Sequence, residues 1–232
     1  MIPDKVESIQ IFGVPIFRVL LVGLSDELGL EKIVRDHVFQ GKPPPEHPLV
    51  ASGRPCVFQS TSSLHTEDEM QPFNEKIIEV MEDVIDQHDM DPSYEIDITS
   101  MWGNVQPQGH AFHRHSHHNN MFAGVYYVNE AENSNLTNTP IEISNMLKGF
   151  PNIIMWNDRR NNPLSPTRNY KHPFNHNSFP VELQKDLLVI FPAWLEHEVG
   201  ENTSTIDRIS ISFNIILRGR YGEVQSNESV II

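Results

Sequence analysis

Histidines are concentrated in one short stretch of this chain. Five of its twelve histidines fall within residues 110–118. In an extended strand, side chains two residues apart point to the same side, so His113, His115 and His117 would share one face. Neutral imidazoles on one face are suitable metal ligands. The cluster therefore predicts a metal site, with a solvated histidine-rich loop as the alternative. His110 and His118 are expected at the surface or in contact with the ligand histidines rather than with the metal.

A second segment, about 80 positions further along, supplies another histidine. Residues 186–199 read DLLVIFPAWLEHEV, an apolar strand that leads through Pro192 to His197. The histidine cluster itself leads directly into the apolar strand MFAGVYYV at 121–128. A single histidine after a buried strand can be an ordinary core residue. Together with an upstream pair, however, His197 would complete a facial site with three ligands.

The segment 207–215 (DRISISFNI) alternates between apolar and polar residues. This period of two predicts a strand with its isoleucines on one face and Arg208, Ser210, Ser212 and Asn214 on the other. Arg208 could be a surface charge at the edge of a sheet. Alternatively, its planar guanidinium could bind a carboxylate inside a barrel, which is a geometry that arginine favours.

Taken together, these segments resemble the 2-oxoglutarate/Fe(II)-dependent dioxygenases, and within them a 2OG-Fe(II) oxygenase family of marine bacteria and phages. The resemblance covers most of the chain, and it implies a mainly β fold, a double-stranded β-helix (jelly roll, cupin-like). It also implies an enzyme that uses Fe(II), O2 and 2-oxoglutarate and hydroxylates a substrate while 2-oxoglutarate is decarboxylated to succinate. The matching segments are His115-Ser-His117, AGVYYV at 123–128, FPAWLEHEV at 191–199, RISISFN at 208–214, FGVPI at 12–16 and FQS at 58–60.

The resemblance implies that His115 and His197 bind iron. Where the class has an aspartate or glutamate two residues after the first histidine, this chain has His117. The expected metal ligands are therefore His115, His117 and His197, with His113 and His115 as an alternative pair. A set of three imidazoles also resembles a cupin-type dioxygenase that uses no 2-oxoglutarate. A non-catalytic metal-binding jelly roll is a third possibility.

The same resemblance places Arg208 and Ser210 on the far carboxylate of 2-oxoglutarate, together with Tyr127. Candidates for substrate binding are Trp102 and Asn104, on the strand that enters the histidine cluster, and Asp158 and Arg159, at the start of a long loop. Candidates to orient the ligand imidazoles through their second nitrogen are Glu196, Glu198 and Asn119. The substrate is expected to be a small molecule or a protein side chain.

The elements that must position these residues fall into two groups. A helix is expected over 25–39, capped by Ser25, and another over 66–88, with apolar residues at helical spacing. We expect these to support the barrel, as helical support over 25–90. The barrel core is expected over about 95–217, in one domain spanning 1–232. The strands of this core are predicted at 95–105, 111–114, 122–128, 140–144, 152–156, 187–191 and 208–217, and a short strand is predicted ahead of it at 57–59.

Composition limits the remaining possibilities. With 17 basic and 31 acidic residues, the net charge is −14, which disfavours nucleic acid or an anionic membrane as partner. Cys56 is the one cysteine, so an internal disulfide is excluded and a reducing, cytoplasmic location is expected. The apolar stretch at 14–24 is too short and too interrupted to span a bilayer. A homodimer paired through N-terminal strands is possible.

Overall fold

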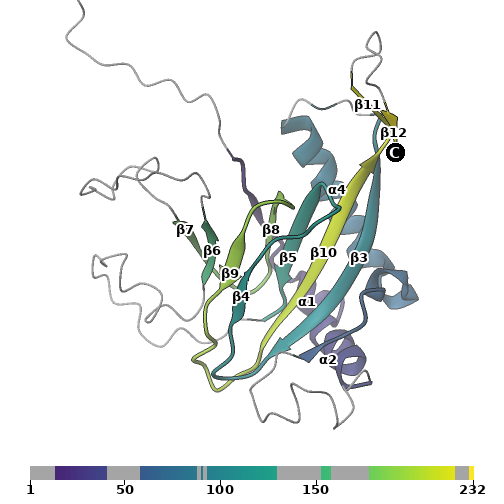
Figure 1. Ribbon diagram of the computed structural model, residues 1–232. Helices are drawn as coiled ribbons and strands as arrows, with labels where there is room; N and C mark the ends of the chain where they lie inside the picture. The colour runs from purple at the N-terminus through teal and green to yellow at the C-terminus, as the bar shows by residue number, and fades with distance from the viewer. Residues whose placement is uncertain are drawn as a thin grey trace, which may run out of the picture.

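The computed structural model describes residues 14–40, 58–87, 90, 93–129, 153–157, 178–222 and 230–232. In this part of the chain, two antiparallel sheets face each other, and the helices lie on the outer side of the larger sheet (Figure 1). This two-sheet arrangement is the jelly roll that the resemblance implied. The predicted strand at 140–144 and most of the loop that begins at 158 lie outside the described residues.

The larger sheet has six strands, and its long pair β3–β10 forms the floor of the site described below. Its order is β1-β8-β5-β10-β3-β2, with every neighbouring pair antiparallel. The strands are β1 Phe17–Leu20, β8 Leu187–Pro192, β5 Phe122–Tyr127, β10 Arg208–Arg218, β3 Glu95–Gln106 and β2 Phe58–Gln59.

The smaller sheet has four strands in the order β4-β9-β6-β7. It faces the inner side of the six-stranded sheet (Figure 1). The sequence analysis predicted strands close to β4 and β6, at 111–114 and 152–156. It did not predict β7 and β9 as separate strands. The strands are β4 Phe112–His115, β9 His197–Val199, β6 Ile153–Asn157 and β7 Ser178–Glu182. A separate two-stranded ribbon joins β11 Arg220–Tyr221 to β12 Val230–Ile231.

The two faces of β10 separate the two hydrophobic clusters, as its alternation predicted. Ile209, Ile211, Phe213 and Ile215 are fully buried in the cluster beneath the helices. Arg208, Ser210 and Asn214 are also buried, but on the opposite face, toward the interior between the sheets. That interior contains the second cluster, which includes Val125, Tyr127 and Phe191 on the neighbouring strands. Arg208 is therefore an internal residue rather than a surface charge.

The first predicted helix is in fact two helices. They are α1 Leu24–Glu27 and α2 Leu30–Gln40, separated by Gly29, whose φ of +63° is incompatible with a continuous right-handed helix. The predicted cap at Ser25 is wrong, because Gly23 occupies the N-cap position and Ser25 lies inside α1. Instead, the Asp186 carboxylate accepts hydrogen bonds from the backbone N–H groups of Gly23 at 2.8 Å and Ser25 at 3.1 Å.

The second predicted helix begins later than expected. The chain first forms two short 3-10 turns, η1 Leu64–Thr66 and η2 Asp68–Met70, and then α4 Gln71–Gln87. Glu67 has an extended backbone between the two turns, so the helix cannot begin at Thr66. The inner face of α4 packs into the larger cluster, as its apolar spacing predicted. None of the described helices is long and apolar enough to cross a membrane.

Candidate metal centre and co-substrate pocket

Strand pairing brings two of the predicted histidines face to face. In the β4–β9 ladder, His115 at the end of β4 lies directly opposite His197 at the start of β9. His117 follows β4 by two residues, and its backbone N–H donates to the carbonyl of Ala193 at 2.8 Å. This bond holds His117 beside the turn that precedes His197. Residues 80 positions apart in the sequence thus become neighbours.

The three imidazoles converge on one point. One ligand nitrogen from each of His115, His117 and His197 lies within 4.8 Å of the other two. The Nε2 atoms of His117 and His197 are 3.4 Å apart, and the two rings are parallel to within 4°. Ligand nitrogens about 2.1 Å from one metal ion are roughly 3.0 to 3.4 Å apart, so this spacing fits a shared metal. His113 lies outside the group.

Backbone carbonyls fix the orientation of two of these rings. Nδ1 of His115 lies 2.7 Å from the carbonyl oxygen of His113, and Nδ1 of His197 lies 3.0 Å from that of Leu195. A carbonyl can only accept, so each Nδ1 carries the hydrogen and each Nε2 presents its lone pair to the centre. The expected orienting groups Glu196, Glu198 and Asn119 are therefore replaced, for these two rings, by the local main chain.

Burial keeps two of the imidazoles neutral. It lowers the pKa of His117 to about 4 and that of His197 to about 3, and the proximity of His115 adds to both effects. For His117, the nearby Asn214 side chain opposes this lowering of the pKa. A neutral imidazole is the form that binds a metal, so these two groups need not lose a proton first at physiological pH.

The histidines open into a cavity of about 470 Å³ between the two sheets. All three line it, as do the predicted residues Trp102, Asn104, Tyr127 and Ser210. The other lining residues come from strands of both sheets and from the segment that follows β2. They are Gln59, Ser60, Ser62, Gln106, Phe112, Gly124, Val125, Phe191, Val199 and Ser212.

Cross-strand register aligns the polar floor of this cavity. Asn104 on β3 lies opposite Ser210 on β10, which in turn lies opposite Tyr127 on β5. The Asn104 amide donates to the hydroxyl oxygens of Ser212 at 3.0 Å and Ser210 at 3.3 Å. Gln59 donates to the Oδ1 atom of Asn104 at 2.8 Å. The described floor is thus polar and uncharged.

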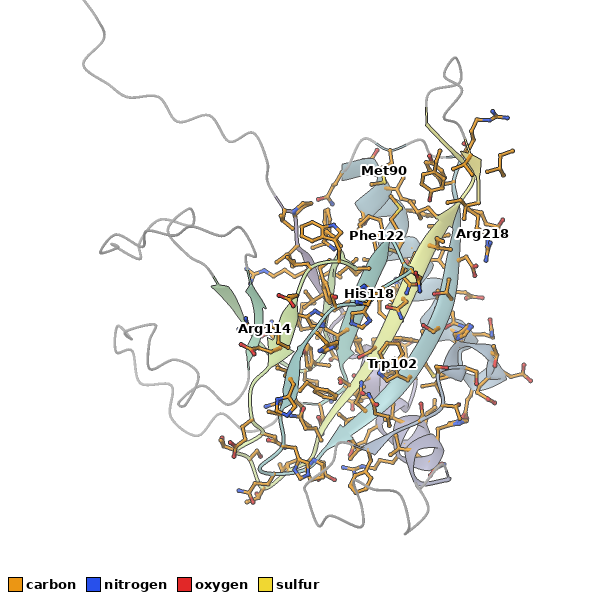
Figure 2. The ribbon with its side chains drawn as sticks, viewed as in Figure 1. Met90, Trp102, Arg114, His118, Phe122 and Arg218 are labelled. Carbon is orange, nitrogen blue, oxygen red and sulfur yellow. The ribbon has the colours of Figure 1, made fainter. Side chains whose placement is uncertain are left out.

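Trp102 forms the wall beside the three histidines. Its ring centroid lies 5.8 Å from that of His117, and the ring planes are 25° apart. Figure 2 shows Trp102 on the β3 side of the molecule and Arg114 on the β4 side, with His118 on the segment that leads from β4 to β5. Trp102 is partly exposed, so it can contact a molecule that approaches the imidazoles from the cavity.

Arg208 lies immediately behind the polar floor and is not among the residues that line the cavity. It is 2% exposed, and burial lowers the pKa of its guanidinium to about 10. Nη1 donates to the carbonyl of Gly200 at 2.8 Å and to Oε1 of Gln106 at 3.2 Å, and Nη2 donates to the carbonyl of Glu201 at 3.3 Å. The charge of Arg208 also acts on the Tyr127 hydroxyl.

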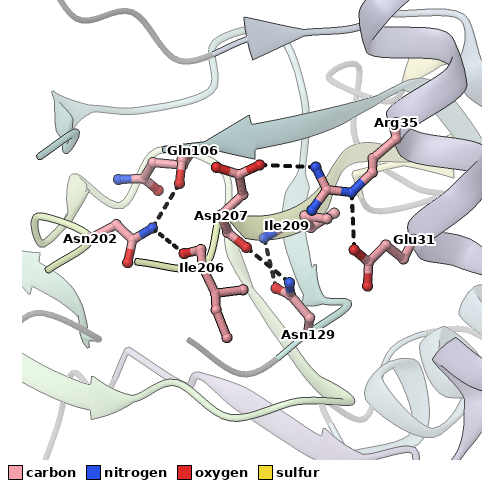
Figure 3. Close-up of polar contacts among 8 residues, drawn as sticks. All are labelled: Glu31, Arg35, Gln106, Asn129, Asn202, Ile206, Asp207 and Ile209. Carbon is pink, nitrogen blue, oxygen red and sulfur yellow. Dashed lines mark hydrogen bonds and ion pairs between the residues drawn. The ribbon is translucent and has the colours of Figure 1, made fainter. Parts of the chain in front are cut away.

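The residues on either side of Arg208 are held by side-chain contacts (Figure 3). Asn129 donates to the carbonyl of Asp207 at 2.9 Å and accepts from the N–H of Ile209 at 2.9 Å. The Asp207 carboxylate pairs with Arg35 of α2 at 2.9 Å. These bonds fix the start of β10 and hence the point from which the Arg208 side chain extends.

The sequence analysis gave no role in the site to Gln106 or Asn214. Gln106 accepts a hydrogen bond from Arg208, and Asn214 lies near His117. The alternation of β10 placed Asn214 on the inner face, but nothing local assigned it a partner. Asp158 and Arg159, predicted to bind substrate, lie outside the described residues.

Comparison with known proteins assigns the family. Residues 100–214, about half of the chain, match the family described as “Putative 2OG-Fe(II) oxygenase”. This segment contains all three converging histidines and Arg208. The chain belongs to the 2OG-Fe(II) oxygenases. It is therefore an oxidoreductase whose metal is Fe(II) and whose co-substrate is 2-oxoglutarate. No curated protein matches its sequence.

Solved structures agree with the fold of this oxygenase. A Pseudomonas putida prolyl-4-hydroxylase is similar with a TM-score of 0.54 at 12% identity, covering 89% of this chain and 94% of that one. The α-ketoglutarate-dependent epimerase SnoN from nogalamycin biosynthesis has a TM-score of 0.55 at 10% identity, covering 92% and 81%. A Paramecium bursaria Chlorella virus-1 collagen prolyl hydroxylase has a TM-score of 0.50 at 10% identity, covering 86% and 94%.

The residues of the oxygenase fit the groups that its family requires. Among the described residues, the convergent group of metal-ligating types consists of three histidines, and the carbonyl bonds of His115 and His197 leave the Nε2 lone pairs of these two rings free for a metal. Tyr127 is 2% exposed, and its hydroxyl has no hydrogen-bond partner in the described part of the chain. Such a buried donor beside a buried cation suits an anionic ligand group. The donor set differs from the usual two histidines and one carboxylate of such iron sites.

Proposed function

We propose that His115, His117 and His197 hold the Fe(II) of this oxygenase. The observation that carries the proposal is the convergence of three inward-facing imidazole nitrogens within 4.8 Å. Carbonyl acceptors fix the rings of His115 and His197, so the free protein is already arranged for binding. Burial supports the neutral form of His117 and His197.

We further propose that Arg208, Tyr127 and Ser210 hold the distal carboxylate of 2-oxoglutarate. Arg208 supplies a buried positive charge and Tyr127 a buried hydroxyl that can donate. Ser210 is two residues from Arg208 on β10 and lies opposite Tyr127 in the β5–β10 register. The three residues and the histidines border the same interior, so a dicarboxylate could reach the metal with its keto-acid end while Arg208 and Tyr127 orient the other end.

The substrate would then occupy the side of the cavity formed by Trp102 and Asn104. When bound, iron and 2-oxoglutarate would together activate O2, with 2-oxoglutarate oxidised to succinate, and the protein would orient the substrate and exclude competing reactions. We propose hydroxylation of a small molecule or a protein side chain in a reducing, cytoplasmic compartment, which the single cysteine favours. The acidic net charge of −14 argues against nucleic acid as substrate.

The decisive experiment is anaerobic titration of the Fe(II)-loaded protein with 2-oxoglutarate, followed by the visible charge-transfer band that the chelated keto acid produces. We expect a saturable band in the wild type. Arg208→Ala should require far more 2-oxoglutarate, because the far carboxylate loses its charged partner. Arg208→Lys should restore only part of the affinity, since an ammonium lacks the planar fork of a guanidinium. Ser62→Ala, at the edge of the same cavity, is the matched control and should titrate like the wild type.

The same titration tests against a cupin-type dioxygenase, a class that the three-histidine ligand set resembles and that uses no keto acid. In that case iron would bind without any band on addition of 2-oxoglutarate, and Arg208→Ala would leave O2 uptake with the true substrate unchanged. A protein that binds the metal but consumes no O2 with any substrate would be a non-catalytic jelly roll. Metal affinity alone cannot separate these, because imidazole sites bind Cu(II), Ni(II) and Zn(II) more tightly than Fe(II).

A further inference from the structure

Asn214 carries a buried amide of which one end is satisfied and the other is not. It lies on the inner face of β10 and is 8% exposed. Its Nδ2 donates to the Ser100 hydroxyl at 2.9 Å, which leaves Oδ1 as the other end of the amide. In the described part of the chain, this buried oxygen accepts no hydrogen bond. Buried acceptors are nearly always paired in folded proteins, so a donor is expected within reach of Oδ1.

The large sheet places His117 over the part of β10 that carries Asn214. In this sheet β5 and β10 lie between β8 and β3 (Figure 1). The His117 ring centroid is 6.3 Å from that of Phe191 on β8 and 5.8 Å from that of Trp102 on β3. Asn214 shares a cross-strand row with Phe191, separated from it by one residue of β5. The imidazole therefore spans the inner face between these two aromatic residues, where the Asn214 amide is located.

His117 differs from the other two histidines in how its ring is held. Carbonyls accept from Nδ1 of His115 and of His197, but the described main chain gives Nδ1 of His117 no carbonyl of this kind. Its Nε2 is turned toward the centre, 3.4 Å from Nε2 of His197. When that nitrogen binds a metal, the ring hydrogen must be on Nδ1. The Asn214 side chain also opposes the lowering of the His117 pKa by burial, which is the effect of an acceptor beside the ring.

On the basis of the metal site proposed above, we propose that Asn214 is the positioning residue of His117, with its Oδ1 as the acceptor for the hydrogen on Nδ1. This contact directs the lone pair of Nε2 toward the metal. All three ligand rings are then oriented, those of His115 and His197 by the main chain and that of His117 by a side chain. Because the acceptor is an amide, it adds no charge to the site.

The test measures Zn(II) affinity of the whole protein by competition with a chromogenic chelator, without 2-oxoglutarate. Asn214→Leu is similar in size but cannot accept a hydrogen bond. We expect it to raise the Kd of Zn(II) by about 10- to 100-fold, the usual result of losing a group that orients a ligand. Asn214→Asp keeps an acceptor at this position and strengthens it with a charge, so it should bind Zn(II) at least as tightly as the wild type.

Thr99→Val is the matched control. The Thr99 hydroxyl donates to the backbone carbonyl of Asn214 at 3.4 Å and to Oδ1 of Asn120 at 2.7 Å. Its loss therefore disturbs the same position of β10 but leaves the Asn214 amide in place. We expect Thr99→Val to bind Zn(II) like the wild type. The midpoint of urea unfolding, measured without metal, establishes that each variant is folded.

A second measurement separates the orientation of one ring from general damage to the site. In the Zn(II)-loaded protein with isotope-labelled histidine, NMR detects each ring N–H, and a hydrogen-bonded N–H exchanges slowly with water. The wild type should give slowly exchanging Nδ1–H signals from His115, His117 and His197. Asn214→Leu should lose this protection at His117 alone, whereas Asn214→Asp should retain it.

Three results would overturn the role of Asn214. Asn214→Leu could bind Zn(II) as tightly as the wild type, or its three ring signals could lose protection together, as a general loosening of the site would cause. Asn214→Asp could also bind Zn(II) as weakly as Asn214→Leu, which would mean that an acceptor is not what matters. A wild-type protein whose Zn(II) affinity is unchanged by His197→Ala is a distinct outcome, because it rejects the proposed metal site itself and the role of Asn214 with it.

Discussion

His117 and His197 lie with their Nε2 atoms 3.4 Å apart on rings parallel to within 4°, although 80 residues separate them in the chain. Two ligand nitrogens about 2.1 Å from one metal ion are roughly 3.0 to 3.4 Å apart, so these two imidazoles can share a metal without moving. The arrangement also places a histidine where related iron sites have a carboxylate.

Position 117 can therefore be tested for its tolerance of a carboxylate. We predict that His117→Asp retains Fe(II) affinity within about tenfold of the wild type, because two histidines and one carboxylate form the usual iron site. His117→Ala should weaken Fe(II) binding by more than about 100-fold, because it removes a ligand. Even the loss of a group that only orients a ligand lowers metal affinity by about 10- to 100-fold. Anaerobic competition with a chromogenic chelator measures both. Equal loss in the two variants would show that an imidazole is required here.

The buried histidines should make the metal-free protein sensitive to mild acid. Burial lowers the pKa of His197 to about 3, whereas in the unfolded chain it is about 6.5. The unfolded state then binds more protons, so the free energy of unfolding decreases as the pH falls below about 6.5. The titration of His197 alone should lower the free energy of unfolding at pH 4 by roughly 3 kcal/mol relative to neutral pH.

Urea denaturation of the metal-free protein between pH 7.5 and 4 measures this effect. His197→Asn, which cannot titrate, should show a shallower decline than the wild type by about the stated amount. His113→Asn is the matched control, because His113 lies in the same cluster but is exposed, and it should decline in parallel with the wild type. Parallel curves for His197→Asn and the wild type would contradict the assignment.

Asp186 should stabilise the junction between α1 and the large sheet. Its carboxylate accepts from Tyr126 at 2.6 Å and from the backbone of Gly23 at 2.8 Å and Ser25 at 3.1 Å. Although burial alone would raise its pKa, these hydrogen bonds hold the pKa of Asp186 below its usual value. We predict that Asp186→Ala lowers the free energy of unfolding by about 3 kcal/mol, on the scale of hydrogen bonds to a charged group.

The pH dependence of this contribution has a definite sign. A lowered pKa means that the stabilisation is present above the unfolded value of about 3.9 and is lost as the pH falls through the folded value. Wild type and Asp186→Asn should therefore converge in stability below pH 3.9. Tyr126→Phe removes one of the three donors and should cost less than Asp186→Ala. Convergence of the curves on going to higher pH instead would refute this reading.

Gly124 should tolerate no larger residue while Phe213 is present. A Cβ atom built at Gly124 would lie 2.2 Å from the Phe213 ring. We predict that Gly124→Ala destabilises the protein by about 2–3 kcal/mol, as overpacking of a core does. Combining it with Phe213→Leu should recover at least about 1 kcal/mol relative to the sum of the single changes, measured by thermal unfolding. Additive effects would mean that the two residues do not compete for space.

Much of the site could be predicted from residue type and local period. The alternation in 207–215 placed Arg208 and Ser210 on one face, and the structure confirms both as interior residues. Period two is a property of the extended backbone itself, so it needs no long-range information. The jelly roll was implied by the resemblance to the oxygenases, and the family match confirms that resemblance. By contrast, apolar periodicity predicted one helix over 25–39, whereas the structure has two helices, α1 and α2, divided at Gly29.

The sequence by itself determined that imidazoles, a guanidinium and a row of hydroxyls would be available on neighbouring strands. Tertiary structure decided which of them meet. The β4–β9 register selected His115 as the partner of His197, and a bond to Ala193 brought in His117 rather than His113. The same is true of Gln106, whose amide meets Arg208 only because β3 and β10 pair in one register. Pairing between distant strands depends on the packing of both faces of a sheet, which no local pattern encodes.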